Sequence, residues 1–121
     1  MFEIEKHFKF HAAHQLMHHD GVCHRLHGHT YILIIRLKSE LLHTSGSSTN
    51  MVIDFAILKD QVQSFIDQYL DHHFLNETLE TDSPTAEFIA EWIYKKLKTN
   101  ILRLSSVTVF ETASSSVTYS E

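Results

Sequence analysis

The chain has 121 residues, of which 43% are hydrophobic and 21% charged, and its formal net charge at pH 7 is -5. This size and composition predict a single soluble domain over residues 1–121. The acidic balance argues against non-specific binding to nucleic acid, which needs a basic surface. No apolar run approaches the length of a membrane span, so we expect no membrane partner.

The single cysteine and the eleven histidines further limit the kinds of chemistry and the cellular compartment that we expect. One cysteine cannot form an intrachain disulfide, and the first residues lack the basic start and apolar run of a signal peptide. We therefore expect a cytoplasmic protein. The high histidine count favours metal binding or proton transfer.

Two strands are predicted in the first third of the chain. Apolar and polar residues alternate from Phe2 to Leu16, with Lys6 as the one break on the apolar side and His14 on that same side. Residues 17–26 form a loop, after which a second strand runs from His27 to about Lys38. The loop is long enough for the two strands to pair antiparallel.

The remaining pattern predicts two amphipathic helices followed by two strands. The helices carry apolar residues at three- and four-residue spacing, and the strands are short and separated by a turn. The order ββααββ favours an α+β fold, a four-stranded antiparallel sheet with both helices on one face. The expected elements are Met51–Ile53 (extended), Phe55 to about Leu70 with Asp54 as N-cap, a loop at Asp71–Asn76, a helix beginning at Ser83-Pro84, and strands Ser105–Thr112 and Ser116–Ser120.

Three histidines form the first candidate site. His27 and His29 project from one face of their strand because side chains alternate, and His14 lies on the expected neighbouring strand. A catalytic zinc ion takes three protein ligands and leaves a position open. The alternative is that these are polar or hydrogen-bonded histidines without a metal.

Cys23 is the second candidate, because His24 and Arg25 beside it can lower the pKa of a thiol and make it reactive. The alternative is a small apolar filler. Asp71 and His72 can form an acid/base pair, or His72 can simply end a helix favourably. Glu111 at the end of a strand can anchor a donor-rich ligand or be a solvated terminus.

Six motifs together resemble the 6-pyruvoyltetrahydropterin synthase superfamily, and within it the bacterial 6-carboxytetrahydropterin synthases of queuosine biosynthesis. They occur in the order of the family and span almost the whole chain. The three residues between Cys23 and His27 resemble the bacterial form. The motifs are Phe10-His11-Ala12-Ala13-His14-Gln15-Leu16, Cys23-x-x-x-His27-Gly28-His29-x-Tyr31, Met51-Val52-Ile53-Asp54-Phe55 with Leu58-Lys59, Leu70-Asp71-His72-x-x-Leu75-Asn76, Pro84-Thr85-x-Glu87 and Glu111-Thr112.

This resemblance implies the tunnelling fold (T-fold), whose subunits assemble through their sheets, commonly as a homohexamer built from two trimers. It also implies a role for each candidate residue. His14, His27 and His29 would bind Zn2+, Cys23 would be the catalytic thiol, Asp71 and His72 its acid/base partners, Glu111 the pterin anchor, and Thr85 a residue near the pterin. Lys6, Lys9 and Arg25 are candidate contacts for a triphosphate.

The implied reaction converts 7,8-dihydroneopterin triphosphate to 6-carboxy-5,6,7,8-tetrahydropterin, acetaldehyde and triphosphate, which is a zinc-dependent carbon–carbon lyase activity. The alternatives are a synthase that forms 6-pyruvoyltetrahydropterin by eliminating triphosphate, and a non-catalytic module that binds pterin or zinc. A generic zinc hydrolase is a further class, but no glutamate base stands beside the histidine pair.

Overall fold

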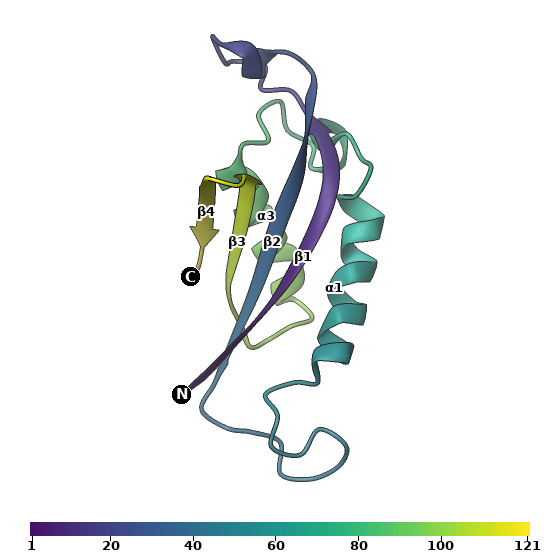
Figure 1. Ribbon diagram of the computed structural model, residues 1–121, viewed down its shortest axis with the longest axis vertical. Helices are drawn as coiled ribbons and strands as arrows, with labels where there is room; N and C mark the ends of the chain where they lie inside the picture. The colour runs from purple at the N-terminus through teal and green to yellow at the C-terminus, as the bar shows by residue number, and fades with distance from the viewer.

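The computed structural model describes residues 1–121 as four strands and three α-helices. Figure 1 shows a long hairpin of two strands, with the two shorter C-terminal strands beside it. The elements are β1 (Phe2–His14), the 3-10 helix η1 (Val22–His24), β2 (His27–Ser39), α1 (Phe55–Tyr69), α2 (Leu75–Thr78), α3 (Ala86–Lys98), β3 (Leu104–Thr112) and β4 (Ser115–Tyr119).

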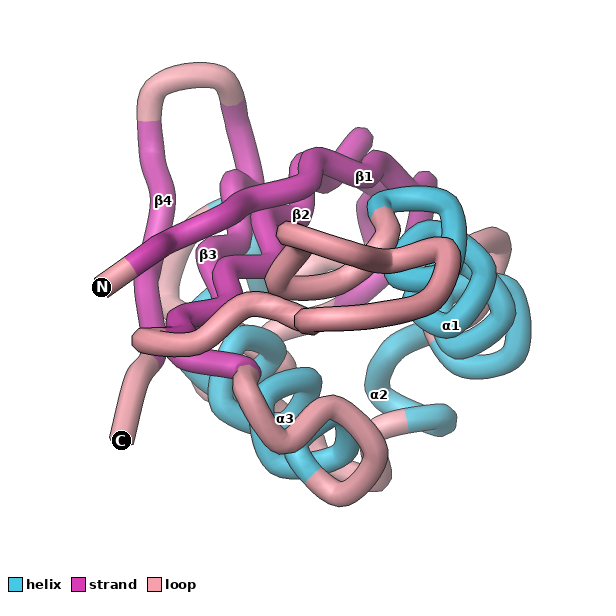
Figure 2. Tube along the Cα trace, turned by 90° about the horizontal axis from the view of Figure 1, so that it is seen from below, coloured by secondary structure: helices cyan, strands magenta, loops and turns pink.

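The four strands form one antiparallel sheet in the order β1-β2-β3-β4. All three helices lie on the same side of it, with α1 against β1 and α3 against β3 and β4 (Figure 2). This is the α+β architecture that the sequence predicts.

The core lies between the sheet and the helices because both surfaces are apolar there. Phe10 and Tyr31 stack with ring centroids 4.9 Å apart on the hairpin, and α1 and α3 bury Leu58 and Ile93 against that face. Burial of this interleaved apolar surface is the main source of stability. None of the helices has the length and apolar composition that crossing a membrane requires.

Several element boundaries differ from the predicted ones. β1 ends at His14 rather than Leu16, because the Leu16 N–H bonds to the Cys23 carbonyl across the loop. The piece expected to be extended at Met51–Ile53 contains two bends and belongs to no strand, and the Met51 N–H closes a turn onto the Ser48 carbonyl. The third helix begins at Ala86, after Pro84.

Two short helices were not predicted at all. The loop expected at Asp71–Asn76 contains the start of α2, and the first long loop contains η1. Each has one turn or less, so neither shows the repeating apolar stripe from which a helix is recognised in sequence.

The chain that follows α1 covers one part of the free edge of β1. His11 N–H donates to the Asp71 carboxylate, Ala13 N–H donates to the His73 carbonyl, and a parallel bridge joins Ala13 to Phe74. The Asn76 side chain then forms two hydrogen bonds with the Gln15 backbone, accepting from its N–H and donating to its carbonyl. These bonds fix the end of β1 that carries His14.

Candidate metal centre and its surroundings

Strand pairing brings the three predicted histidines together at one end of the hairpin. His14 and His27 are directly opposite in the β1–β2 register, and His29 is two residues further along β2 on the same face. The three ring centroids lie 4.5, 4.9 and 5.0 Å apart. The sequence therefore predicted this cluster correctly as a spatial group.

Glu111 at the end of β3 completes the group. Its Oε1 lies 3.0 Å from His29 Nε2 and 3.3 Å from His14 Nε2. One ligand atom from each of the four residues falls within 4.8 Å of the others. The sequence predicted Glu111 only as an anchor for a donor-rich ligand at the end of its strand, not as a member of the histidine group.

Backbone carbonyls orient two of the imidazoles. His14 Nδ1–H donates to the Pro84 carbonyl at 2.9 Å, and His27 Nδ1–H donates to the Arg25 carbonyl at 2.6 Å. With these partners the two Nε2 atoms carry lone pairs, and they face each other at 2.9 Å. Two such lone pairs repel unless a proton or a cation lies between them.

A third nitrogen in the cluster also lacks a partner. His29 Nε2 is buried without a hydrogen bond, because its approach to Glu111 has ion-pair distance but not hydrogen-bond geometry. A buried polar atom without a hydrogen-bond partner is costly and therefore rare. Three imidazole nitrogens and a carboxylate oxygen match the donor set that zinc accepts, so the residues fit such an ion.

Burial tunes the protonation of the cluster. It lowers the pKa of His14 and the pKa of His29 below the usual histidine value, so both rings are neutral near pH 7, as metal ligands must be. Burial raises the pKa of Tyr31, so its hydroxyl, 3.2 Å from His14 Nδ1, stays protonated.

Asp71 and His72 form a pair on the edge of β1. His72 Nδ1 lies 2.8 Å from Asp71 Oδ2, while the other carboxylate oxygen accepts the His11 N–H at 2.9 Å. His72 has a φ of 59° and its N–H donates to the His11 carbonyl. The His11 N–H, and then His72, hold the pKa of Asp71 below its ordinary value.

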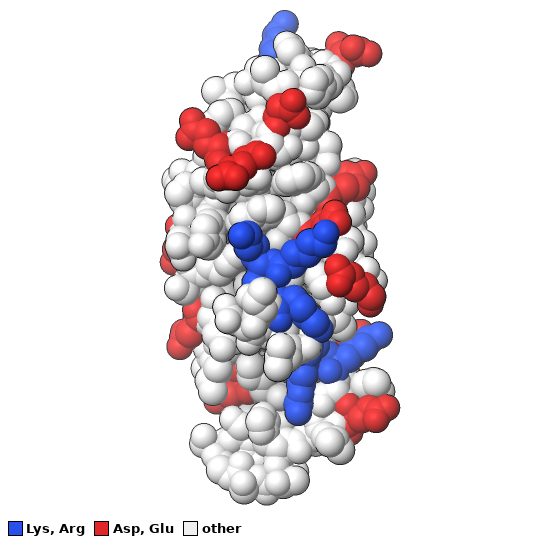
Figure 3. All heavy atoms as spheres, turned by 180° about the vertical axis from the view of Figure 1, so that it is seen from behind, with Lys and Arg blue, Asp and Glu red and all other residues white.

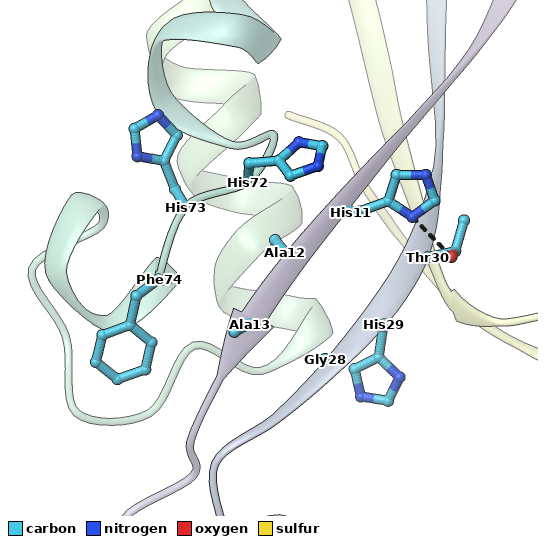
Figure 4. Close-up of a pocket in the computed structure, with 9 residues that line it drawn as sticks. All are labelled: His11, Ala12, Ala13, Gly28, His29, Thr30, His72, His73 and Phe74. Atoms are coloured by element: carbon cyan, nitrogen blue, oxygen red, sulfur yellow. Dashed lines mark hydrogen bonds between the residues drawn. The ribbon is translucent and has the colours of Figure 1, made fainter.

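One pocket of about 570 Å³ contains members of both groups, since His29 and His72 line it together with His11 and Thr30. In Figure 4 His72 and His11 lie on the same side of the pocket, His11 bonds to Thr30, and His29 points away from them. Within one chain the Asp71–His72 pair and the histidine cluster are thus neighbours without direct contact.

Cys23 and Thr85 are not members of the cluster. Cys23 is half-buried in η1 as a free thiol, and its sulfur is not among the converging ligand atoms. Thr85 is the N-cap of α3, where its hydroxyl accepts the Phe88 N–H at 3.2 Å. It directly follows Pro84, whose carbonyl holds His14.

Comparison with known proteins places these features in one family. A family model described as 6-pyruvoyl tetrahydropterin synthase matches residues 3–121. The 6-carboxy-5,6,7,8-tetrahydropterin synthase of Synechocystis sp. is 46% identical, covering 98% of this chain and 93% of that protein. The enzyme of the same name from Haemophilus influenzae is 38% identical over the full length of both chains.

The fold comparison agrees. The structure of Caenorhabditis elegans 6-pyruvoyl tetrahydropterin synthase superimposes with a TM-score of 0.83 at 30% sequence identity, covering 99% of this chain and 95% of that one.

Proposed function

Because the chain belongs to the 6-pyruvoyl tetrahydropterin synthase family, we propose that it converts 7,8-dihydroneopterin triphosphate to 6-carboxy-5,6,7,8-tetrahydropterin, acetaldehyde and triphosphate. The names of its full-length relatives support the carboxy-forming reaction. The observation that carries the proposal is the convergence of three imidazoles and one carboxylate at the hairpin end. We further propose that the reaction serves queuosine biosynthesis in the cytoplasm.

His14, His27 and His29 would hold a zinc ion in this proposal. Their Nε2 atoms converge, and the Nδ1 bonds of His14 and His27 to backbone carbonyls fix the tautomer and the orientation of the two rings. A zinc ion there would act as a Lewis acid that polarises the side-chain oxygens of the substrate. The low pKa values of His14 and His29 favour binding near neutral pH.

Proton transfer falls to Cys23, Asp71 and His72. The Asp71 carboxylate bonds to His72 Nδ1, which fixes the tautomer and leaves His72 Nε2 free to accept or donate a proton. Cys23 as thiolate would move a proton on the substrate side chain. The His72 side chain is 78% exposed, so it is open to a substrate or to a second subunit.

We also propose a homohexamer assembled through sheet edges. The segment after α1 covers β1 only from His11 onward, so the edge of residues 3–9 is open, and β4 is the opposite edge of the sheet. Open strand edges are templates for pairing with another chain. Such pairing would place active-site residues of neighbouring subunits close to each other.

Glu111 and Thr85 would contact the pterin. A carboxylate can accept two parallel N–H bonds from the amidine edge of a pterin, in the way that it does from arginine. The Glu111 side chain is 25% exposed, so it remains reachable from solvent beside the histidines. Thr85 lies at the N-terminus of α3, next to the Pro84 that supports His14.

The test is incubation with dihydroneopterin triphosphate and mass analysis of the products. Acetaldehyde together with 6-carboxytetrahydropterin is the expected result, and triphosphate release without acetaldehyde would instead indicate the pyruvoyl-forming reaction. Cys23→Ala should lower turnover by about 100-fold or more while the metal content is unchanged. Unchanged turnover would contradict the role given to this thiol.

A further inference from the structure

The His11 imidazole lies in the same pocket as His72, and the proposed reaction gives it no role. It projects from the face of β1 that the helices leave uncovered, opposite Thr30 in the β1–β2 register. Its Nδ1 lies 2.9 Å from the Thr30 hydroxyl, and this hydrogen bond limits the rotation of the ring. Thr30 directly follows His29, so the strand that carries two of the clustered histidines also holds His11.

The main chain of His11 supports the Asp71–His72 pair at two points. Its N–H donates to the Asp71 carboxylate at 2.9 Å, and its carbonyl accepts the His72 N–H at 2.6 Å. His72 has a φ of 59°, a left-handed conformation that few residues other than glycine adopt and that persists where neighbouring bonds hold it. The backbone of the pair is therefore fixed relative to β1.

The His72 side chain has less support than its backbone. It is 78% exposed, and its Nδ1 is bonded to one Asp71 oxygen at 2.8 Å. The His11 ring lies edge-on to the His72 ring, with centroids 6.0 Å apart and an interplanar angle of 63°. Aromatic rings prefer this edge-to-face arrangement. The His11 ring thus restricts the rotation of an imidazole that one hydrogen bond alone would leave free to turn.

No cation helps to orient His72. The wall of the shared pocket contains neither lysine nor arginine. These residues gather instead on the helix-covered side of the molecule (Figure 3), where the last turn of α3 carries Lys95, Lys96 and Lys98. The orientation of the His72 ring therefore depends on the Asp71 carboxylate and on the ring beside it.

We propose that His11 is a positioning residue for His72 and that Thr30 holds it in place. The contacts run from Thr30 on β2 through the His11 ring on β1 to the His72 ring in the loop after α1. If the His72 ring turned away from Asp71, it would lose the bond that fixes its tautomer, and its Nε2 would leave the position from which it transfers a proton. This inference rests on the proposed function, because it takes His72 as a proton-transfer group.

The first experiment compares the turnover of dihydroneopterin triphosphate by His11→Ala, His11→Phe and the wild type. His11→Ala should lower kcat by about tenfold or more and change KM by less than about twofold, because misalignment weakens the transition state and not substrate binding. His11→Phe keeps the edge contact without a nitrogen, so its kcat should stay within about threefold of the wild-type value. If His11→Phe is as slow as His11→Ala, a nitrogen of His11 is required and the positioning role is wrong.

The second experiment removes the support of His11 and not His11 itself. Thr30→Val replaces the hydroxyl by a methyl group of similar size in a strand, and it should lower kcat by about threefold. Combined with His11→Ala, it should cause no further loss, because the two residues act through one contact. Independent, multiplying losses would contradict the proposal.

His7→Ala is the matched control, since His7 lies on the same face of β1 outside the pocket and should be dispensable for turnover. Circular dichroism melting establishes that the variants are folded. If His11→Ala does not fold, His11→Phe and Thr30→Val carry the test.

Nuclear magnetic resonance of the metal-loaded protein with 15N-labelled histidine needs no turnover, so it separates this inference from the proposed function. The His72 signal, assigned by its loss in His72→Asn, should show one tautomer protonated at Nδ1 in the wild type and a mixture of both tautomers in His11→Ala. An unchanged His72 signal in His11→Ala would refute the positioning role, even in an active enzyme. A wild type that does not turn over the substrate, but whose His72 tautomer depends on His11, would refute the proposed function alone.

Discussion

The histidine cluster and the Asp71–His72 pair are built in contrasting ways. The cluster stands on two long paired strands and is supported by backbone carbonyls, and its His14 is fully buried. The pair stands on a loop that is bonded to the edge of β1, and its His72 is exposed with a positive φ. Both nevertheless line or adjoin the same pocket.

The proposed function assigns a different role to each of the two regions. Rigid strands fix the relative positions of several ligand atoms, which an ion with a preferred geometry requires. An exposed imidazole held by one carboxylate keeps a free nitrogen and can reach a substrate or another subunit. We therefore expect metal binding and proton transfer to be separable by substitution.

His72→Asn gives the largest expected effect. Asparagine tolerates the positive φ but cannot relay a proton, so turnover of the proposed substrate should fall by about 10²–10⁴-fold. Zinc content, measured by mass spectrometry of the folded protein, should not change. His73→Asn is the matched control, and loss of zinc in His72→Asn would show that the two regions are not separable.

His29→Ala addresses the cluster itself. Removing one nitrogen ligand should weaken metal binding by more than about 100-fold, because even outer-shell substitutions typically cost 10–100-fold. The apparent affinity can be measured by competition with a chromogenic chelator. His24→Ala removes an imidazole outside the cluster and should retain wild-type affinity; equal affinities of both variants would contradict the assignment.

Thr85→Ala tests whether the N-cap of α3 supports the histidine cluster. Loss of the side-chain bond to the Phe88 N–H should lower the free energy of unfolding by about 1 kcal/mol. Because Pro84 precedes the cap and holds His14, metal affinity should fall several-fold as well. Urea denaturation measures the first effect, and Thr85→Ser should retain both properties.

Asp71→Asn should cause the smallest of these changes in stability, and the change should depend on pH. The pKa of Asp71 in the folded protein is lower than its ordinary value of 3.8. The charged carboxylate therefore stabilises the fold at pH values above 3.8. That contribution disappears as the pH falls through the folded-state value. The difference in melting temperature between wild type and Asp71→Asn should therefore shrink from pH 5 to pH 3, and a constant difference would refute the coupling.

Local patterns account for most of what was predictable. Alternation identified β1 and β2, and the spacing of Leu58, Val62 and Ile66 identified α1 within a residue of its observed end. Hairpin pairing was enough to group His14 with His27 and His29. Each of these features depends on residues that are close in sequence, or on the single loop that joins β1 to β2.

The features that escaped prediction depend on distant contacts. Glu111 meets His29 because β3 pairs with β2 across more than half the chain, beside an irregularity in the β3–β4 register. Asp71 is fixed by the His11 N–H, a bond that exists only because β1 is an edge strand. No local sequence pattern specifies the order in which the four strands pair or which strand lies at the edge of the sheet.

The carbonyls that orient the His14 and His27 imidazoles also make this orientation robust to mutation. The acceptors for His14 and His27 are main-chain oxygens of Pro84 and Arg25, so exchanging the Arg25 side chain leaves its acceptor in the chain. Had a carboxylate side chain held the ring, one codon change could have abolished the alignment. A substitution at position 25 therefore keeps the acceptor that fixes the tautomer of His27.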